Sequence, residues 1–106
     1  MVKRPVLIAV SLALLAQNNW AAEIAAPRRA ELLNLLKHDC GSCHGLSLKG
    51  GLGPALTPDK LTGKPVDFLA TTILYGRYGT PMPPWRPFLS DPEALWLAEQ
   101  IKAGVR

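Results

Sequence analysis

The chain has two cysteines, Cys40 and Cys43, which are separated by two residues and followed at once by His44. Two thiols at this spacing can each add to one vinyl group of the same porphyrin and form two thioether bonds. The imidazole that comes next is then held under the ring, at bonding distance from iron. Cys-x-x-Cys-His is the attachment signature of a c-type haem. We therefore expect Cys40 and Cys43 to hold a haem covalently and His44 to be an axial iron ligand.

A Cys-x-x-Cys pair also occurs in redox dithiols and in zinc sites. A thioredoxin-like dithiol is expected within a βαβ pattern, and no such pattern surrounds this pair. A closed zinc site needs four ligands. The chain offers two cysteines and two histidines, all between His38 and His44, a segment too short to form a tetrahedral cage. Haem attachment is the favoured interpretation.

Met82 is the candidate for the second axial ligand. It lies in the segment Gly79-Thr80-Pro81-Met82-Pro83-Pro84-Trp85, where the prolines exclude regular secondary structure and make the backbone rigid. A methionine that only fills a core benefits from flexibility, whereas this segment would hold a thioether in one place. Pairing of histidine with methionine raises the potential of cytochromes c. The alternatives are a core-filling or a surface methionine.

The segment from Gly45 to Gly63 is rich in glycine and proline and predicts a loop. A metal-bound histidine usually donates its second ring N–H to a nearby carbonyl. The carbonyl of Pro54 is the candidate acceptor for His44, with an ordinary turn as the alternative. His38, the other histidine, lies on the same segment as His44, and we expect it to be exposed rather than bound to iron.

Residues 1–22 are typical of a cleaved secretory signal peptide, which leaves 23–106 as a single domain. Lys3 and Arg4 precede an apolar run from Val6 to Ala16, which is shorter than the roughly 20 residues that span a bilayer. We therefore expect export to the periplasm without stable membrane insertion. Export is consistent with haem attachment, which in bacteria takes place outside the cytoplasm.

Three helices are predicted: Ala26 to about Lys37, Lys64 to Tyr75, and Ala94 to Ala103. The first has a broad leucine stripe, and the second has apolar residues at helical spacing. The third follows the capping box Ser90-Asp91-Pro92-Glu93. Because no strand pattern occurs and the connections are rich in glycine and proline, the sequence predicts an all-α domain wrapped around the cofactor.

Composition limits the classes of function. The chain is 48% hydrophobic and 19% charged, which excludes a disordered protein. Its net charge is +4, but without Lys3 and Arg4 there are 10 basic against 8 acidic residues. We expect no nucleic-acid partner, because no basic patch stands out. A domain this small has a marginal core, which a large buried porphyrin would supplement.

The order of these features resembles a small monohaem class I cytochrome c over essentially the whole mature chain. The resemblance implies one haem on Cys40 and Cys43, axial ligation by His44 and Met82, and orientation of His44 by the Pro54 carbonyl. It also implies that the first and last helices cross. The residues that would then meet are Ala30, Leu33 and Leu36 on one helix and Leu95, Trp96 and Ile101 on the other.

Three stretches are similar to the small periplasmic denitrification cytochromes of the cytochrome c55X, or NirC, family: Leu35 to Gly45, Gly50 to Leu56, and the Met82 segment. This resemblance implies a monomeric electron carrier, not an enzyme, that donates to cytochrome cd1 nitrite reductase. A quinol-oxidising complex or another cytochrome would reduce it. Two alternatives stay open: an accessory role in haem d1 insertion or maturation of that reductase, and general donation to a terminal oxidase.

With both axial positions filled, the iron would have no open position for chemistry, which favours a carrier over an enzyme or a gas sensor. Electrons would then pass through the exposed haem edge beside Cys43. Four small apolar residues are candidates for the rim of that edge: Ala55, Leu56, Pro83 and Pro84.

Overall fold

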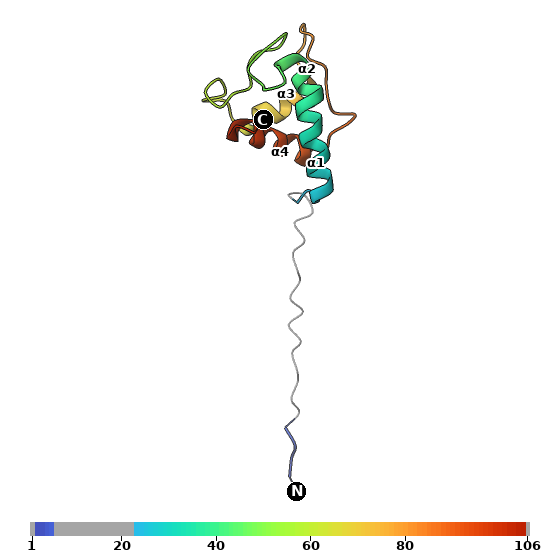
Figure 1. The fold of residues 1–106 in the computed structure, drawn as a ribbon. Coiled ribbons are helices and arrows are strands. Elements are labelled where there is room, and N and C mark those ends of the chain that lie inside the picture. Colours follow the sequence, from blue (N-terminus) through green and yellow to red (C-terminus); the bar gives the residue numbers. More distant parts are fainter. Residues whose placement is uncertain (1, 6–22, 106) are drawn as a thin grey trace.

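The computed structural model describes residues 2–5 and 23–105, and within them every regular element is helical (Figure 1). The elements are α1 (Ala26–Leu35), the π-helical turn η1 (Leu36–Cys40), α2 (Gly41–His44), α3 (Val66–Tyr75) and α4 (Asp91–Ala103). The predicted all-α fold is confirmed. The expected signal peptide lies mostly outside the described residues. None of the helices in residues 2–5 and 23–105 has the length and apolarity to cross a membrane.

The N-terminal helix is longer than the sequence predicts. It was expected to end near Lys37, but α1 continues through η1 into α2 and ends at His44. In η1 the backbone N–H of Gly41 bonds to the carbonyl of Leu36, five residues back. The rod ends at Gly45, whose φ of +92° favours glycine. Cys40, Cys43 and His44 thus lie on a helix rather than on a loop.

The other two helices begin and end as their local signals indicate. α3 starts at Val66, two residues later than predicted, because Pro65 is still extended and serves as its N-cap. α4 begins with a complete capping box: the Ser90 hydroxyl accepts from the Glu93 N–H, and the Glu93 carboxylate accepts from the Ser90 N–H. It ends at Gly104 in the left-handed conformation.

The core is formed mainly where α3 packs against α4, with α1 crossing α4. Its buried side chains are Leu32, Leu36, Leu48, Leu61, Ala70, Ile73, Leu74, Leu89, Ala94, Leu97, Ala98 and Ile101. The expected helix contact was partly wrong, since Ala30 and Leu33 are exposed. The buried face of this continuous helix carries Leu32 of α1 and Leu36 of η1, one helical turn apart.

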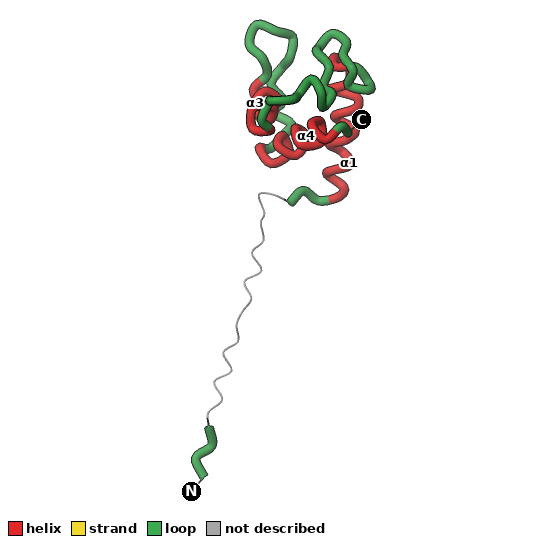
Figure 2. Tube along the Cα trace, turned by 90° about the vertical axis from the view of Figure 1, so that its left-hand side faces the viewer, coloured by secondary structure: helices red, strands yellow, loops and turns green. Residues whose placement is uncertain are grey.

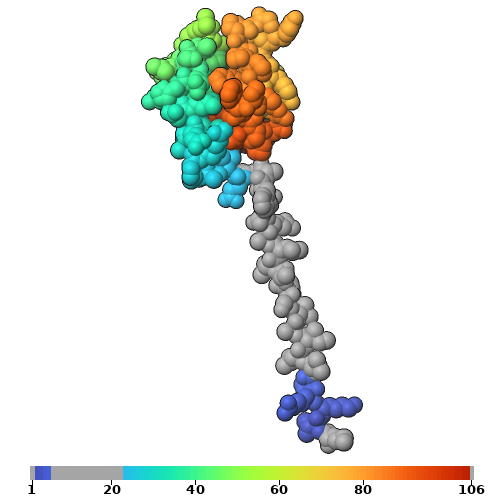
Figure 3. Space-filling model, turned by 90° about the vertical axis from the view of Figure 1, so that its right-hand side faces the viewer, coloured from blue at the N-terminus to red at the C-terminus, as the bar shows by residue number. Residues whose placement is uncertain are grey.

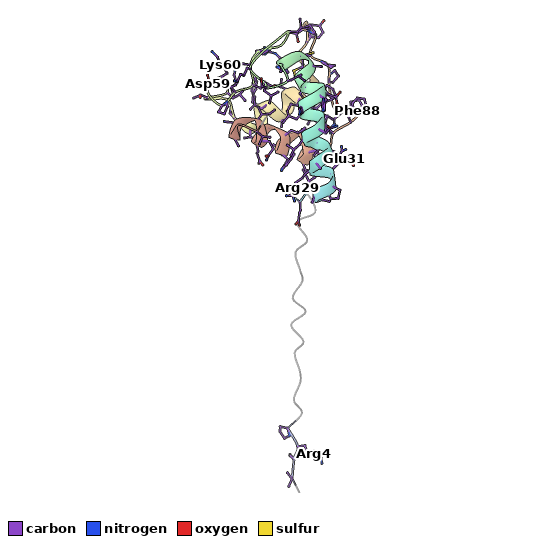
Figure 4. The ribbon with its side chains drawn as sticks, viewed as in Figure 1. Arg4, Arg29, Glu31, Asp59, Lys60 and Phe88 are labelled. Carbon is purple, nitrogen blue, oxygen red and sulfur yellow. The ribbon has the colours of Figure 1, made fainter. Side chains whose placement is uncertain are left out.

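Arg28 joins the beginning of α1 to the beginning of α4. Its guanidinium pairs with Glu93 and with Glu31, and it also donates to the carbonyl oxygen of Phe88. Figure 3 shows α1 packed side by side with the later part of the chain, and Figure 4 shows Glu31 and Phe88 on the same side of the molecule. Because Arg28 lies one turn before Leu32, its ion pair with Glu93 and the buried Leu32 lie on the same face of α1.

Two long connections extend beyond the helices (Figure 2). The first, 45–65, follows α2, and the second, 76–90, joins α3 to α4. The second returns along the end of α3, where the N–H groups of Trp85 and Arg86 bond to the carbonyls of Ile73 and Leu74, at 3.0 and 3.1 Å. These two connections carry Pro54 and Met82.

A candidate haem site

His44 is the last residue of α2, and its side chain is only 9% exposed. Its Nδ1 lies 2.6 Å from the carbonyl oxygen of Pro54. A carbonyl oxygen can only accept, so Nδ1 carries a proton, and in the neutral imidazole Nε2 then keeps its lone pair. This is the tautomer in which an imidazole can bind a metal through Nε2 while a second partner fixes the ring.

The first connection is folded back onto the end of α2, and this places Pro54 beside the imidazole. The N–H of Gly50 bonds to the carbonyl of His44 at 2.8 Å, and the N–H of Gly53 bonds to the carbonyl of Cys43 at 2.7 Å. These bonds also satisfy carbonyls that a helix end would otherwise leave unpaired. A Cβ on Gly53 would lie 2.8 Å from the His44 Nδ1, so only glycine fits here without displacing the ring or the chain.

Cys40 and Cys43 are both half-buried free thiols. Burial, helped by the neighbouring charge of Asp39, raises the pKa of Cys40 to about 11. A redox dithiol needs a lowered thiol pKa, because the thiolate is the nucleophile. In residues 2–5 and 23–105, no three His, Cys, Asp or Glu side chains gather as a ligand set for a metal ion. The surroundings of Cys40 therefore disfavour the dithiol, and a zinc site would lack its ligands.

Met82 lies on the second connection, in a loop that is closed by hydrogen bonds. The N–H of Arg77 bonds to the carbonyl of Met82 at 3.2 Å. Inside the loop, the Thr80 N–H and hydroxyl both donate to the carbonyl of Arg77, at 3.1 and 2.7 Å. The Met82 side chain is half-buried and packs against the core. The Met82 side chain therefore lies against the core, and a hydrogen bond to Arg77 holds its backbone.

The remaining predicted residues divide between surface and interior. His38 is exposed, as predicted. Of the expected rim, Pro83 and Pro84 are exposed, whereas Ala55 and Leu56 are half-buried, and Leu56 packs against the core. Sequence reasoning missed Leu52, which is 81% exposed beside Gly53. Its signal was an apolar residue inside a glycine-rich loop.

The residues present fit a covalent haem. Two thiols with two residues between them lie on one continuous helix, an imidazole has its Nδ1 proton engaged, and the backbone at Gly53 approaches the ring where a side chain would collide with it. When bound, the haem supplies an iron that cycles between Fe(II) and Fe(III). An all-α fold with this motif at the end of its first helix defines a c-type cytochrome.

The comparisons with known proteins agree with this class. The family described as "Cytochrome C oxidase, cbb3-type, subunit III" matches residues 27–101. Cytochrome c55X of Pseudomonas aeruginosa is 57% identical over 79 residues, which are 74% of this chain and 66% of that protein's length. The solved structure of a c-type cytochrome NirC is 55% identical with a TM-score of 0.75, over 77% of this chain and 96% of that one.

A second solved structure, "Dihydro-heme d1 dehydrogenase NirN in complex with DHE", has a TM-score of 0.61 at 32% identity. The match covers 65% of this chain but only 15% of that protein. The chain belongs to the c-type cytochromes of the cytochrome c55X family, which confirms the resemblance found in its sequence. Members of this class are electron-transfer proteins with covalently bound haem c.

Proposed function

We propose that this chain is a periplasmic electron carrier with one haem that donates single electrons to cytochrome cd1 nitrite reductase. The proposal assigns Cys40 and Cys43 to the thioether bonds and His44 and Met82 to the iron. The observation that carries it is the hydrogen bond from His44 Nδ1 to the Pro54 carbonyl, which prepares Nε2 for iron. With Met82 as the second ligand, the iron has no open position, and the haem serves electron transfer alone.

The surface and the leader support this assignment. Apolar side chains are exposed close to Cys43 in the sequence and on the Met82 connection: Leu52, Pro83 and Pro84. A small contact of this kind suits a transient redox encounter, which typically buries less than about 1,200 Å². Export to the periplasm and cleavage after residue 22 rest on the leader sequence. The link to nitrite reduction rests on the family.

The test is anaerobic stopped-flow mixing of the reduced holoprotein with oxidised cytochrome cd1 nitrite reductase. A terminal oxidase, mixed in parallel, is the control for indiscriminate donation. Fast and saturable oxidation by the reductase, together with slow oxidation by the oxidase, is the expected result. Equal rates with both partners would make the chain a general donor, and slow reaction with both would remove the donor assignment.

A second candidate function is electron acceptance during maturation of haem d1. The likeness to part of the dihydro-haem d1 dehydrogenase structure favours it, because that enzyme contains a domain similar to this chain. A dehydrogenation releases two electrons and two protons, and a one-electron carrier would remove the electrons singly. The measurement is reduction of the oxidised holoprotein by that dehydrogenase and its substrate. A deletion strain whose reductase lacks haem d1 would support this function, whereas a loaded but electron-starved reductase would support donation.

A further inference from the structure

Gly76 lies directly against the backbone that carries Met82. It ends α3 with a φ of +69°. A Cβ at this position would lie 2.7 Å from the Met82 carbonyl oxygen, 2.7 Å from the Pro83 carbonyl carbon and 2.8 Å from the Pro84 nitrogen. All three distances are shorter than real Cβ contacts allow, so any side chain at Gly76 must displace this segment.

The three contacted atoms belong to the backbone, so no side-chain rotation can relieve the collision. The segment is also held at both ends. The N–H of Arg77 bonds to Met82 at 3.2 Å, and the N–H of Trp85 bonds to Ile73 at 3.0 Å. Pro83 restricts the φ/ψ choices of Met82, and Pro81 has its own φ fixed just before it. A displacement at Gly76 is therefore passed to Met82 rather than absorbed between them.

Two other glycines serve as comparisons, because they share the positive φ of Gly76 but lack its close contact. Gly79 and Gly63 have φ values of +76° and +77°, close to that of Gly76, but a Cβ on either would meet nothing within 4 Å. Alanine at any of the three would need a positive φ, and at Gly76 the ψ of −170° adds a conformation that is essentially restricted to glycine. Only at Gly76 does alanine also push on the peptide of the Met82 residue.

We propose that Gly76 is a positioning residue for the Met82 thioether. Because Gly76 has no side chain, the Met82–Pro83 peptide lies against the end of α3, and this contact fixes the position of the Met82 sulfur atom. The inference rests on the proposed role of Met82 as an axial ligand. A side chain at Gly76 displaces the sulfur and weakens its bond to iron, while the core formed by α3 and α4 remains.

The experiment compares the holoproteins of Gly76→Ala and Gly79→Ala, with Gly63→Ala as a control outside the loop. The primary measurement is the near-infrared charge-transfer absorption that reports sulfur bound to Fe(III). The second is binding of carbon monoxide to the ferrous protein, which needs an open axial position. Thermal unfolding measures the destabilisation of each variant, including the added strain at Gly76. We expect Gly76→Ala alone to lose the absorption and to bind carbon monoxide, with a lowered reduction potential.

Two results would overturn the inference. One is an unchanged absorption in Gly76→Ala, with no binding of carbon monoxide. The other is an equal loss in Gly79→Ala, which would assign the effect to backbone strain. If Gly76→Ala yields too little holoprotein, the double variant Gly76→Ala/Pro83→Gly replaces it, because glycine at 83 loosens the displaced segment. The single variant Pro83→Gly is its control. A double variant that yields no more holoprotein than Gly76→Ala also contradicts the role of Gly76, because loosening the segment should relieve a collision with it.

Met82→Ala separates this inference from the proposed function. If Met82→Ala keeps the sulfur absorption and the reduction potential of the wild type, Met82 is not the ligand and both proposals fail. If Met82→Ala loses them while Gly76→Ala does not, the ligand assignment stands and only the role of Gly76 is removed. If both variants lose them and Gly79→Ala does not, both proposals are supported.

Discussion

The backbone of Gly53 faces the imidazole of His44 so closely that a methyl group on Gly53 would lie 2.8 Å from Nδ1 and from Cε1. The same turn brings the Pro54 carbonyl to 2.6 Å from Nδ1. The hydrogen bond and the missing side chain thus depend on each other, because the carbonyl reaches the ring only where the preceding residue has no Cβ.

Gly53→Ala should reduce the fraction of chains with covalent haem and destabilise the holoprotein by about 1–3 kcal/mol, the usual cost of overpacking. The collision must move either the imidazole or the loop that holds it. Haem content per chain and denaturant unfolding measure the two effects. Gly41→Ala is the matched control, since its Cβ has no contact closer than 3.4 Å and lies on a helix. Equal losses in both variants would contradict the role given to Gly53.

Met82→Ala should lower the reduction potential markedly and allow carbon monoxide to bind the ferrous protein. The reason is that a thioether ligand favours Fe(II), and its removal opens one axial position. Redox titration and absorption spectroscopy measure both effects, with Pro84→Ala as a control on the same connection. An unchanged potential would show that Met82 is not the ligand.

Glu93→Gln should destabilise the fold by about 0.5–1 kcal/mol near neutral pH, because it removes the charge that pairs with the partly exposed Arg28. Glutamine keeps the capping box, since its side-chain oxygen still accepts from the Ser90 N–H. The hydrogen bond from Arg28 holds the pKa of Glu93 below its usual 4.5. The stabilisation is therefore present above pH 4.5 and is lost as the pH falls through the lowered pKa.

The measurement is the free energy of unfolding of wild type and Glu93→Gln at neutral pH and at successively lower pH. The difference between the two should shrink in the acid range. Glu99→Gln, an exposed position on the same helix, is the control. A difference that is constant with pH would show that the ion pair contributes nothing.

Leu52→Glu should slow electron transfer to the redox partner if the apolar surface near Cys43 is the docking surface. Leu52 is 81% exposed, so a charge there disturbs an encounter without entering the core. The control is Phe68→Glu, which is 54% exposed on α3, away from this connection in the sequence. Stopped-flow rates of both variants with the reductase decide the matter. Equal slowing would place docking elsewhere.

The sequence predicted the features that depend on local chemistry. The capping box at Ser90, the proline start of α3 and the glycine stop at Gly104 lie where propensity and hydrogen bonding put them. The approach of Pro54 to His44 was expected from the needs of a metal-bound imidazole. The ligand roles of Cys40, Cys43, His44 and Met82 are still predictions.

Contacts between distant segments were harder to predict. The leucine stripe of the first helix is wide enough to be buried on either side, and the burial of Leu32 rather than Leu33 follows from how the helix packs against the rest of the chain. The extension through η1 to His44 needs the loop that returns to cap it. Gly76 resembles any helix-ending glycine in the sequence, and only the returning chain shows what it touches.

The closed loop from Arg77 to Met82 has a consequence for the speed of electron transfer. When an iron changes oxidation state, every ligand atom that must move adds to the reorganisation energy. The backbone of Met82 is held by its hydrogen bond to Arg77 and lies against Gly76 at the end of α3. Its thioether therefore has little freedom to move when the iron changes between Fe(II) and Fe(III). With Met82 as the ligand, the protein would exchange electrons quickly even when the driving force is small.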